Sequence, residues 1–312
     1  MNNKVSAYLK EHAAMVTKAG PEIINGFKGC HPRLLEAMIY SYTAGGKRLR
    51  PSMLYASYEL FGGKAEEITP AAVALEMLQT YSLIHDDLPC MDNDDLRRGR
   101  PTNHKVFGEA NALLAGDALA IDPFTVMLNS EYPEHVMKHL CRAAGIFARR
   151  AGAQGMISGQ FLDKESEGFL LNPQNMPPED LKKEGLRRLE YIQLHKTADL
   201  FMMATEIGTV LAGAPEEDFN LMSKYGLETG LCLQISDDIL DVTADRKKLG
   251  KSSNDAEMGK LTYVTLFGLD GAKEHLDRHY KAALEALDKV NGKQELKDIL
   301  AGIAEYICVR DL

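Results

Sequence analysis

Tryptophan is absent from this sequence, aromatic residues make up only 7% of it, and cysteine is rare and scattered. The 312 residues contain five cysteines, an odd number without a CxxC pair, namely Cys30, Cys90, Cys141, Cys232 and Cys308. Disulfide frameworks and zinc sites are built from cysteines at fixed, paired spacings, and neither pattern is present. The sequence therefore predicts reduced thiols and a cytoplasmic protein.

Long apolar runs and an excess of positive charge are also lacking. The segment Met1–Met15 holds no continuous apolar stretch, and no later window reaches about 18 uncharged apolar residues, so we expect no signal peptide and no membrane span. The formal net charge is −9. Because an acidic protein repels a phosphate backbone, nucleic acid is not an expected partner.

Strand patterns are nearly missing, since no alternating run of β-branched residues is bounded by turn dipeptides. Apolar residues recur at helical spacing instead, most clearly over 71–83. The same spacing predicts helices over 31–44, 52–60, 110–121, 134–158, 179–212, 219–241, 262–289 and 293–309. Breaks are expected at 61–63, 172–180, 213–215 and 243–260. We therefore expect one all-α domain over 1–312, although length alone would suggest two domains.

The first unusual cluster is the acidic sequence Asp86-Asp87-Leu-Pro-Cys-Met-Asp92. It continues with Asn93-Asp94-Asp95. Carboxylates this close repel one another unless cations neutralise them. A solvated helix end is the ordinary interpretation, and an EF-hand is excluded because its Gly and Glu are missing. On a regular helix Asp86 and Asp92 would face different sides. We expect Pro89 to distort the helix, so that Asp92 returns towards Asp86.

A second acidic cluster, Asp237-Asp238-Ile-Leu-Asp241, weakens that ordinary interpretation. It places Asp237 and Asp241 on one face of a helix, inside the otherwise apolar stretch 227–242. Two like charges on such a face need a reason. Pairs of hard oxygen ligands with open positions suit Mg²⁺ ions that bridge a phosphate-bearing substrate.

Basic residues accompany both clusters. Arg97-Arg98-Gly-Arg100 follows the first and the run 246–251 follows the second, and a salt-bridged, solvated surface would explain either. The group Gly45-Gly46-Lys47-Arg48-Leu49-Arg50-Pro51 has no acid beside it in the sequence. Glycines before a basic run indicate a backbone turn that brings cations to an anion.

Together these motifs resemble the trans-isoprenyl diphosphate synthases, the head-to-tail chain-elongating prenyltransferases, and most closely the bacterial farnesyl diphosphate synthases. The resemblance runs from about Ala44 to Arg310, and its two acidic motifs lie about 150 residues apart. It rests on GGKRLRP (45–51), YSLIHDDLPCMDNDDLRRGRPT (81–102), LLAGDAL (113–119), GMISGQFLD (155–163), HKT (195–197), QISDDILD (234–241), LGK (249–251), GKLTY (259–263) and YICVR (306–310). It implies a helical bundle around a central apolar cavity, and a homodimer.

The resemblance also implies roles for single residues. Asp86 and Asp92 would bind two Mg²⁺ ions and Asp237 a third, with Asp238 and Asp241 in support. The residues expected to hold the allylic diphosphate are Arg97, Lys196, Lys251 and Lys260. Those expected to grip isopentenyl diphosphate are Lys47, Arg50, Gln79 and Arg98. Thr197 and Gln234 would line the reaction centre beside Lys196, and His195 would position Lys196.

Several positions depart from the family pattern. Gln79 stands where bacterial members often carry a His, and Leu233 replaces a frequent Phe. The stretch 251–260 is one residue shorter than usual and lacks the usual Gly within 251–255, and Val264 occupies a common Pro position. The last two changes lie in a segment expected to close over the site, so they bear on closure and rate rather than on the class of reaction.

The implied chemistry fits these residue types. An allylic C–O bond ionises when divalent ions and basic side chains stabilise the leaving diphosphate. The double bond of isopentenyl diphosphate then attacks the cation, so no side-chain nucleophile is required. Two rivals share part of this pattern. A terpene cyclase would carry an Asn/Ser/Glu motif in place of Asp237–Asp241, and an inactive partner subunit would have lost acids.

Product length should follow the depth of the apolar cavity below the metal site. On a helix, Ser82 and Tyr81 lie four and five residues before Asp86, about 6 to 7.5 Å along the axis and close to one isoprene unit. The resemblance associates an aromatic residue at the fifth position with a fifteen-carbon product. The ordinary alternative is that Tyr81 packs in a helix interface. We expect farnesyl diphosphate, with geranylgeranyl diphosphate as the alternative.

Overall fold

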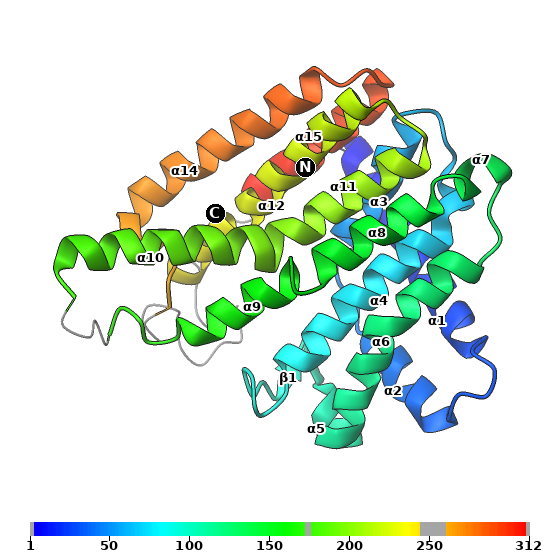
Figure 1. Cartoon of the computed structure of the whole chain (residues 1–312), viewed down its shortest axis with the longest axis horizontal. Helices are drawn as coiled ribbons and strands as arrows, with labels where there is room; N and C mark the ends of the chain where they lie inside the picture. Colours follow the sequence, from blue (N-terminus) through cyan, green and yellow to red (C-terminus); the bar gives the residue numbers. More distant parts are fainter. Residues whose placement is uncertain (1–2, 172–175, 244–259, 310–312) are drawn as a thin grey trace. The chain divides into compact units, whose positions relative to one another are not determined.

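The computed structural model describes residues 3–171, 176–243 and 260–309 (Figure 1). Regular structure in these ranges is helical apart from one short hairpin, so the predicted all-α fold is confirmed. The chain forms two compact units. The N-terminal unit comprises residues 3–145 and 207–214, and the C-terminal unit comprises the described parts of 146–206 and 215–309. The single domain and the central cavity stay predictions.

The N-terminal unit is built around α4 (Thr69–Asp86), with Pro70 in its first turn. Every side chain from Ala71 to Leu78 is buried, which is typical of a helix covered on all sides. The helices that pack on α4 are α1 (Asn3–Asn25), α2 (Pro32–Tyr42), α3 (Leu49–Glu59) and α6 (Glu109–Asn129). The short helices of this unit are η1 (Ala65–Ile68), α5 (Asn103–Phe107) and α7 (Glu134–Met137). This packing fixes the position at which α4 ends.

The basic group 45–51 contains one buried ion pair. Arg48 and Glu76 of α4 form a salt bridge in which the two side chains are only 1% and 3% exposed. The Arg48 guanidinium also donates to the carbonyl oxygen of Tyr42. The sequence showed no acid near this group, but folding brings one from 28 residues away. Arg48 is therefore a structural residue, whereas Lys47 is exposed and Arg50 half-buried.

We expect Arg48→Met to lower the free energy of unfolding by about 3–5 kcal/mol, because the Glu76 carboxylate would stay buried without its cation. Urea unfolding followed by circular dichroism measures this change. The neighbouring exposed variant Lys47→Met is the control, with an expected change within about 0.5 kcal/mol. Equal effects of the two substitutions would contradict the assignment of Arg48.

The C-terminal unit surrounds α12 (Glu216–Thr243), which packs against α14 (Tyr263–Asp288), α15 (Gln294–Val309) and a π-helix labelled η2 (Gln193–Ala198). The π-helix lies between α10 (Pro178–Ile192) and α11 (Asp199–Leu211), and it also packs against α9 (Met156–Glu165). At the start of α14, the hydroxyl of Thr262 accepts a hydrogen bond from the backbone N–H of Thr265. Helix α12, which carries the second acidic motif, is thus packed against α14, α15 and the π-helix.

The prediction of one continuous helix over 134–158 is wrong, because this stretch contains α7, α8 (Leu140–Ala151) and the start of α9. Gly152 and Gly155 make the turn between α8 and α9, and a Cβ at Gly155 would overlap the carbonyl of Arg150. The helix over 179–212 is interrupted by the π-helix, and α1 was not predicted. The predicted breaks at 61–63 and 213–215 are present, with positive φ at Gly62 and Gly213. Residues 172–175 and 244–259, and with them Lys251, lie outside the described residues.

Helix α6 is long and apolar enough to cross a membrane, by length and composition alone. A core helix of a soluble protein passes the same test, and a single such helix is weak support for a span. The expected absence of a membrane span stays a prediction.

Candidate functional site

The first acidic motif begins where α4 ends. Asp86 is the last helical residue, and the chain then turns back, so that the backbone N–H of Asp92 donates to the carbonyl of Asp86 at 2.8 Å. Pro89 has no N–H to continue the helix, which explains why the helix stops here rather than bends. The predicted return of Asp92 is therefore present in the backbone. The Asp86 side chain is half-buried and that of Asp92 is exposed.

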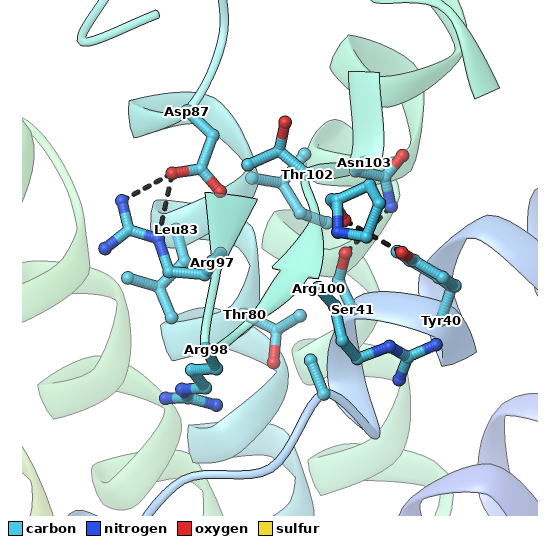
Figure 2. A pocket seen from close by; sticks show the side chains of 13 residues that line it. Tyr40, Ser41, Thr80, Leu83, Asp87, Arg97, Arg98, Arg100, Thr102 and Asn103 are labelled. Atoms are coloured by element: carbon cyan, nitrogen blue, oxygen red, sulfur yellow. Dashed lines mark hydrogen bonds and ion pairs between the residues drawn. The ribbon is translucent and has the colours of Figure 1, made fainter. Parts of the chain in front are cut away.

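Asp87 points away from this exposed end. It is 3% exposed, and its Oδ1 accepts a hydrogen bond of 2.9 Å from Nε of Arg97 (Figure 2). Burial raises the pKa of Asp87, and the Arg97 guanidinium opposes this rise. Arg97 also bonds Asp94 at 3.1 Å. Two carboxylates thus hold Arg97 in this structure, and its expected part in diphosphate binding stays a prediction.

A small hairpin carries Arg98. Strands β1 (Leu96–Arg97) and β2 (Arg100–Pro101) are antiparallel and are joined by Arg98 and Gly99, at φ 53° and 75°. Positive φ at both central residues is the preferred geometry of a two-residue hairpin turn. The Arg98 guanidinium donates to the carbonyl of Gly45, and a Cβ at Gly46 would overlap that guanidinium. The absence of a Cβ lets Arg98 reach the turn that precedes Lys47. Arg98 and the basic group 45–51 therefore meet, as the proposed diphosphate grip requires.

A pocket lies between α2, the end of α4 and this hairpin (Figure 2). Tyr40 of α2 donates to the carbonyl of Pro101 at 2.8 Å, and its ring lies 4.3 Å from the guanidinium carbon of Arg100. Asn103 donates to the carbonyl of Ala37 at 2.9 Å. The sequence did not reveal Tyr40 or Asn103, because they support the hairpin across more than 60 positions of the chain. Arg97, Arg98 and Arg100 make the lining basic.

Tyr81 is half-buried on α4, five residues before the acidic motif begins at Asp86. Its ring meets that of His85 edge to face, with centroids 4.8 Å apart. His85 Nε2 lies 3.0 Å from the carbonyl oxygen of Leu113 on α6, and a Cβ at Gly116 would overlap the His85 ring. Burial raises the pKa of the Tyr81 hydroxyl, and the negative charge of Asp86 raises it further. Helix α6 therefore fixes His85, which packs against Tyr81.

Two neighbours of Tyr81 were also predicted to face substrate. The Ser82 hydroxyl donates to the carbonyl of Gln79 at 3.0 Å. The side-chain amide oxygen of Gln79 is buried and has no hydrogen-bond partner within the described part of the chain. Because amide oxygen and nitrogen are interchangeable by a flip, this position offers a donor or an acceptor to a ligand.

In the C-terminal unit the π-helix brings the predicted reaction-centre residues together. Thr197 donates to Oε1 of Gln234 at 2.9 Å, and Nε2 of Gln234 donates to Asp238 at 3.0 Å. Lys196 forms an ion pair with Asp163 of α9. The sequence contained Asp163 in the motif 155–163, but spacing alone gave no reason to pair it with Lys196. These contacts hold the π-helix side chains against α9 and α12.

Asp238 connects three elements. It is 3% exposed, and its Oδ2 accepts a hydrogen bond of 3.0 Å from the backbone N–H of Tyr263 and one of 3.4 Å from the Gln193 amide. Its Oδ1 accepts the hydrogen bond from Gln234, so both oxygens are hydrogen-bonded within the protein. The supporting role of Asp238 at a metal ion stays a prediction. On the same helix Asp237 is exposed and Asp241 is buried. Lys260 is half-buried just before α14.

The donor chemistry of both motifs suits Mg²⁺. Among the residues that the structure describes, no three His, Cys, Asp or Glu side chains group closely enough to form a complete metal site. Mg²⁺ is bound in proteins by one or two carboxylates, with substrate phosphates and waters completing its octahedron. Paired acids such as Asp86 and Asp92 fit that requirement, because phosphate oxygens and waters would supply the remaining ligands.

Comparisons with known proteins agree with this chemistry. Residues 31–301 match the family model described as polyprenyl synthetase. Farnesyl diphosphate synthase of Bacillus subtilis is 41% identical over 279 residues, which cover 89% of each chain. The large subunit 1 of the chloroplastic heterodimeric geranylgeranyl pyrophosphate synthase of Arabidopsis thaliana is 43% identical over 282 residues, 89% of this chain and 72% of that one.

A solved structure matches as well. The geranyltransferase of Helicobacter pylori, crystallised with magnesium and isoprenyl diphosphate, superposes with a TM-score of 0.77 at 31% identity and covers 98% of both chains. The family match spans most of the sequence, and the acidic motifs, the basic group and the π-helix fall within it. This chain belongs to the polyprenyl synthetase family and is a transferase of prenyl groups.

Proposed function

We propose that this protein condenses isopentenyl diphosphate with dimethylallyl or geranyl diphosphate and releases farnesyl diphosphate and diphosphate. The observation that carries the fifteen-carbon product is Tyr81, an aromatic side chain that contacts His85 and lies five residues before Asp86. A ring fixed there closes an apolar cavity about one isoprene unit below the diphosphates. The similarity to the Bacillus subtilis farnesyl diphosphate synthase supports this product.

Geranylgeranyl diphosphate is the second candidate product. It is favoured by the similarity to the Arabidopsis thaliana geranylgeranyl pyrophosphate synthase, which is as high as the similarity to the farnesyl enzyme. Ser82, beside Tyr81, is small, and a small side chain there would favour a longer product. The two products differ by one isoprene unit, so Tyr81 is the residue that separates them.

In the proposed site, acidic side chains bind metal ions and basic side chains bind the allylic diphosphate. In this proposal Asp86, Asp92 and Asp237 hold the Mg²⁺ ions, three per active site, and Lys196 and Arg97 bind the same allylic diphosphate. Mg²⁺, when bound, supplies positive charge that stabilises the leaving diphosphate. The magnesium and isoprenyl diphosphate in the Helicobacter pylori geranyltransferase support this assignment.

A second group of residues serves the other substrate. Lys47, Arg50 and Arg98 hold isopentenyl diphosphate, and Gln79 offers its side-chain amide. Thr197 and Gln234, hydrogen-bonded to each other at 2.9 Å, present a fixed polar surface to the allylic cation. The proton lost from the new chain passes to the released diphosphate. A cytoplasmic homodimer completes the proposal, and light scattering of the purified protein tests the dimer.

The proposed activity predicts strict dependence on Mg²⁺ and on both substrates. Radiolabelled isopentenyl diphosphate incubated with geranyl diphosphate and Mg²⁺ is expected to give mainly the C15 product, and excess EDTA should abolish incorporation because bare diphosphate is a poor leaving group. Ca²⁺ in place of Mg²⁺ serves as the control for non-specific ionic effects. Mainly C20 or longer products would exclude the farnesyl assignment. Cyclisation of geranyl diphosphate alone would indicate a cyclase, and no reaction an inactive subunit.

A further inference from the structure

The π-helix Gln193–Ala198 requires support from its surroundings, because a π-turn holds one residue more than an α-turn and is intrinsically less stable. Two glycines supply close support. A Cβ at Gly159 of α9 would overlap the backbone of Lys196, and one at Gly230 of α12 would press on Ala198. Each glycine therefore lets a neighbouring helix pack directly on the π-helix backbone. Local π-turns of this kind occur frequently at functional sites.

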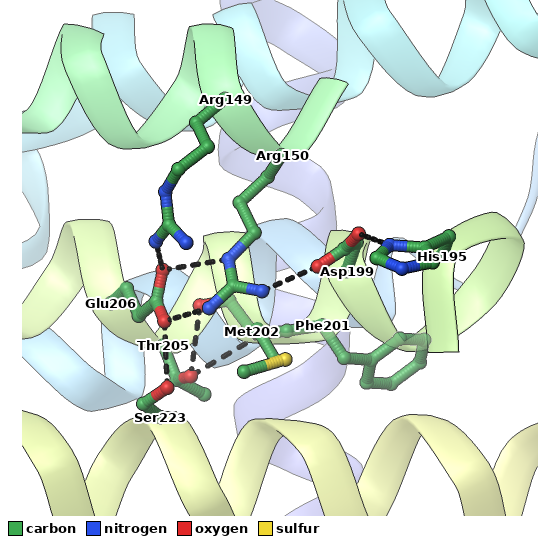
Figure 3. A network of polar contacts seen from close by, with 9 residues as sticks. All are labelled: Arg149, Arg150, His195, Asp199, Phe201, Met202, Thr205, Glu206 and Ser223. Carbon is green, nitrogen blue, oxygen red and sulfur yellow. Dashed lines mark hydrogen bonds and ion pairs between the residues drawn. The ribbon is translucent and has the colours of Figure 1, made fainter. Parts of the chain in front are cut away.

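A buried polar network supports the end of the same segment (Figure 3). Asp199 is the first residue of α11 and directly follows the π-helix. Its Oδ2 lies 2.8 Å from Nδ1 of His195, one turn earlier, and its Oδ1 lies 2.5 Å from Nη1 of Arg150 on α8. The carboxylate thus connects a residue of the π-helix to a different helix. Since Asp199 is 1% exposed, water cannot readily replace either partner.

Arg150 is itself fixed by a second carboxylate. Its Nε and Nη2 donate to the two oxygens of Glu206 at 3.1 and 2.5 Å, a bidentate arrangement that allows only one orientation of the guanidinium. Glu206 is also buried and accepts a further hydrogen bond of 2.6 Å from Ser223 of α12. Burial alone would lower the pKa of Arg150, and the two carboxylates more than reverse this. The guanidinium is therefore a rigid, charged connection between Glu206 and Asp199.

We propose that Arg150 is a positioning residue for prenyl transfer, which acts through Asp199 and His195 to hold the π-helix in the register that presents Lys196 and Thr197 to the allylic diphosphate. This inference rests on the proposed function of Lys196. Without Arg150, Asp199 loses its rigid partner and the π-turn relaxes towards α-helical geometry. A shift of one residue rotates a side chain by about 100° around a helix axis. Lys196 would then leave its place beside Asp163.

The test compares two adjacent arginines of α8. Arg149 is half-exposed, and the one carboxylate that it approaches within the described ranges is Glu206, at 3.7 Å, so Arg149→Met removes the same charge without touching Asp199. We expect Arg150→Met to raise the KM for geranyl diphosphate and to lower kcat by about 10-fold to 100-fold in total, the range that misplacement by about 1 Å costs. The KM for isopentenyl diphosphate should stay within about twofold, because its proposed ligands lie in the other unit. Arg150→Lys, which keeps the charge, should recover part of the loss.

A merely structural role would give a different result. Arg150→Met would then melt at a lower temperature, but its folded fraction would bind both substrates with unchanged KM, and this outcome overturns the proposal. If Arg150→Met does not fold, Asp199→Asn preserves the shape and removes the charge, and it should raise the same KM. An unchanged KM for Asp199→Asn also overturns the proposal.

A double-mutant cycle links the network to Lys196. If Arg150 acts through the π-helix, Arg150→Met should change the KM for geranyl diphosphate clearly less in a Lys196→Ala background than in the wild type, the remainder being the share of Thr197. Additive effects would show that the two residues act independently and would reject the proposal. Elongation by the wild-type protein tests the proposed function separately, so failure of one idea is distinguishable from failure of the other.

Discussion

Asp86→Asn is expected to lower kcat about 100-fold to 1,000-fold, the range that removal of one group stabilising developing charge costs. Asn keeps the size of the side chain and the helix end, but it loses the negative charge that a divalent ion needs. Steady-state elongation of geranyl diphosphate at saturating Mg²⁺ measures the effect. The KM values should change less than kcat, because the ion contributes most as the C–O bond breaks.

Asp95→Asn is the matched control for this substitution. Asp95 belongs to the same acidic run, but it is exposed and paired with Lys105 at 2.7 Å. Exposed ion pairs contribute about 1 kcal/mol or less, so activity should stay within about twofold of the wild type. Near-normal activity of Asp86→Asn, or an equal loss in both variants, would remove Asp86 from the proposed metal site.

Tyr81→Ala is expected to change the main product from C15 to C20 and longer. Removal of the ring opens space along α4, and His85, which the Leu113 carbonyl holds at 3.0 Å, stays in place instead of filling it. Radiolabelled products separated by reversed-phase chromatography show the change. The rate of the first condensation should fall little, since the proposed role of Tyr81 is to limit chain growth and not to bind a diphosphate.

Ser82→Ala provides the comparison, because it removes a hydroxyl that bonds Gln79 without opening comparable space. Its product distribution should remain that of the wild type. If Tyr81→Ala also kept the C15 product, the ring would be an ordinary part of the helix interface, and another residue would limit the chain.

Helical periodicity predicted the segments whose burial follows one simple pattern. The core helices α4 and α12 were identified from apolar residues alone, and the turn after α4 followed from Pro89. Helix α1 was missed, although its buried positions Val5, Leu9, Val16 and Ile24 recur at helical spacing. A count of that spacing over the first 25 residues would have found it.

The parts that the sequence could not predict depend on contacts between distant segments. The π-helix is indistinguishable from an α-helix in its residue pattern, and its support comes from Gly159 and Gly230 on other helices. The pairing of Arg48 with Glu76 assigns one cation of the basic group to the fold, and no local pattern reveals that. Similarly, Asp238 belongs to an acidic motif but binds the backbone of Tyr263, 25 residues later.

In the hairpin turn that carries Arg98, chain stability and the proposed binding role of this residue make opposite demands. A left-handed backbone costs a side-chain-bearing residue about 1–2 kcal/mol, and Gly or Asn would occupy φ 53° with less strain. A protein selected for stability alone would therefore not keep arginine at this position. The turn nevertheless contains arginine, and its guanidinium donates a hydrogen bond to the carbonyl of Gly45. The proposed binding of isopentenyl diphosphate by Arg98 would account for this choice, because tighter binding of an anion then outweighs a small gain in stability.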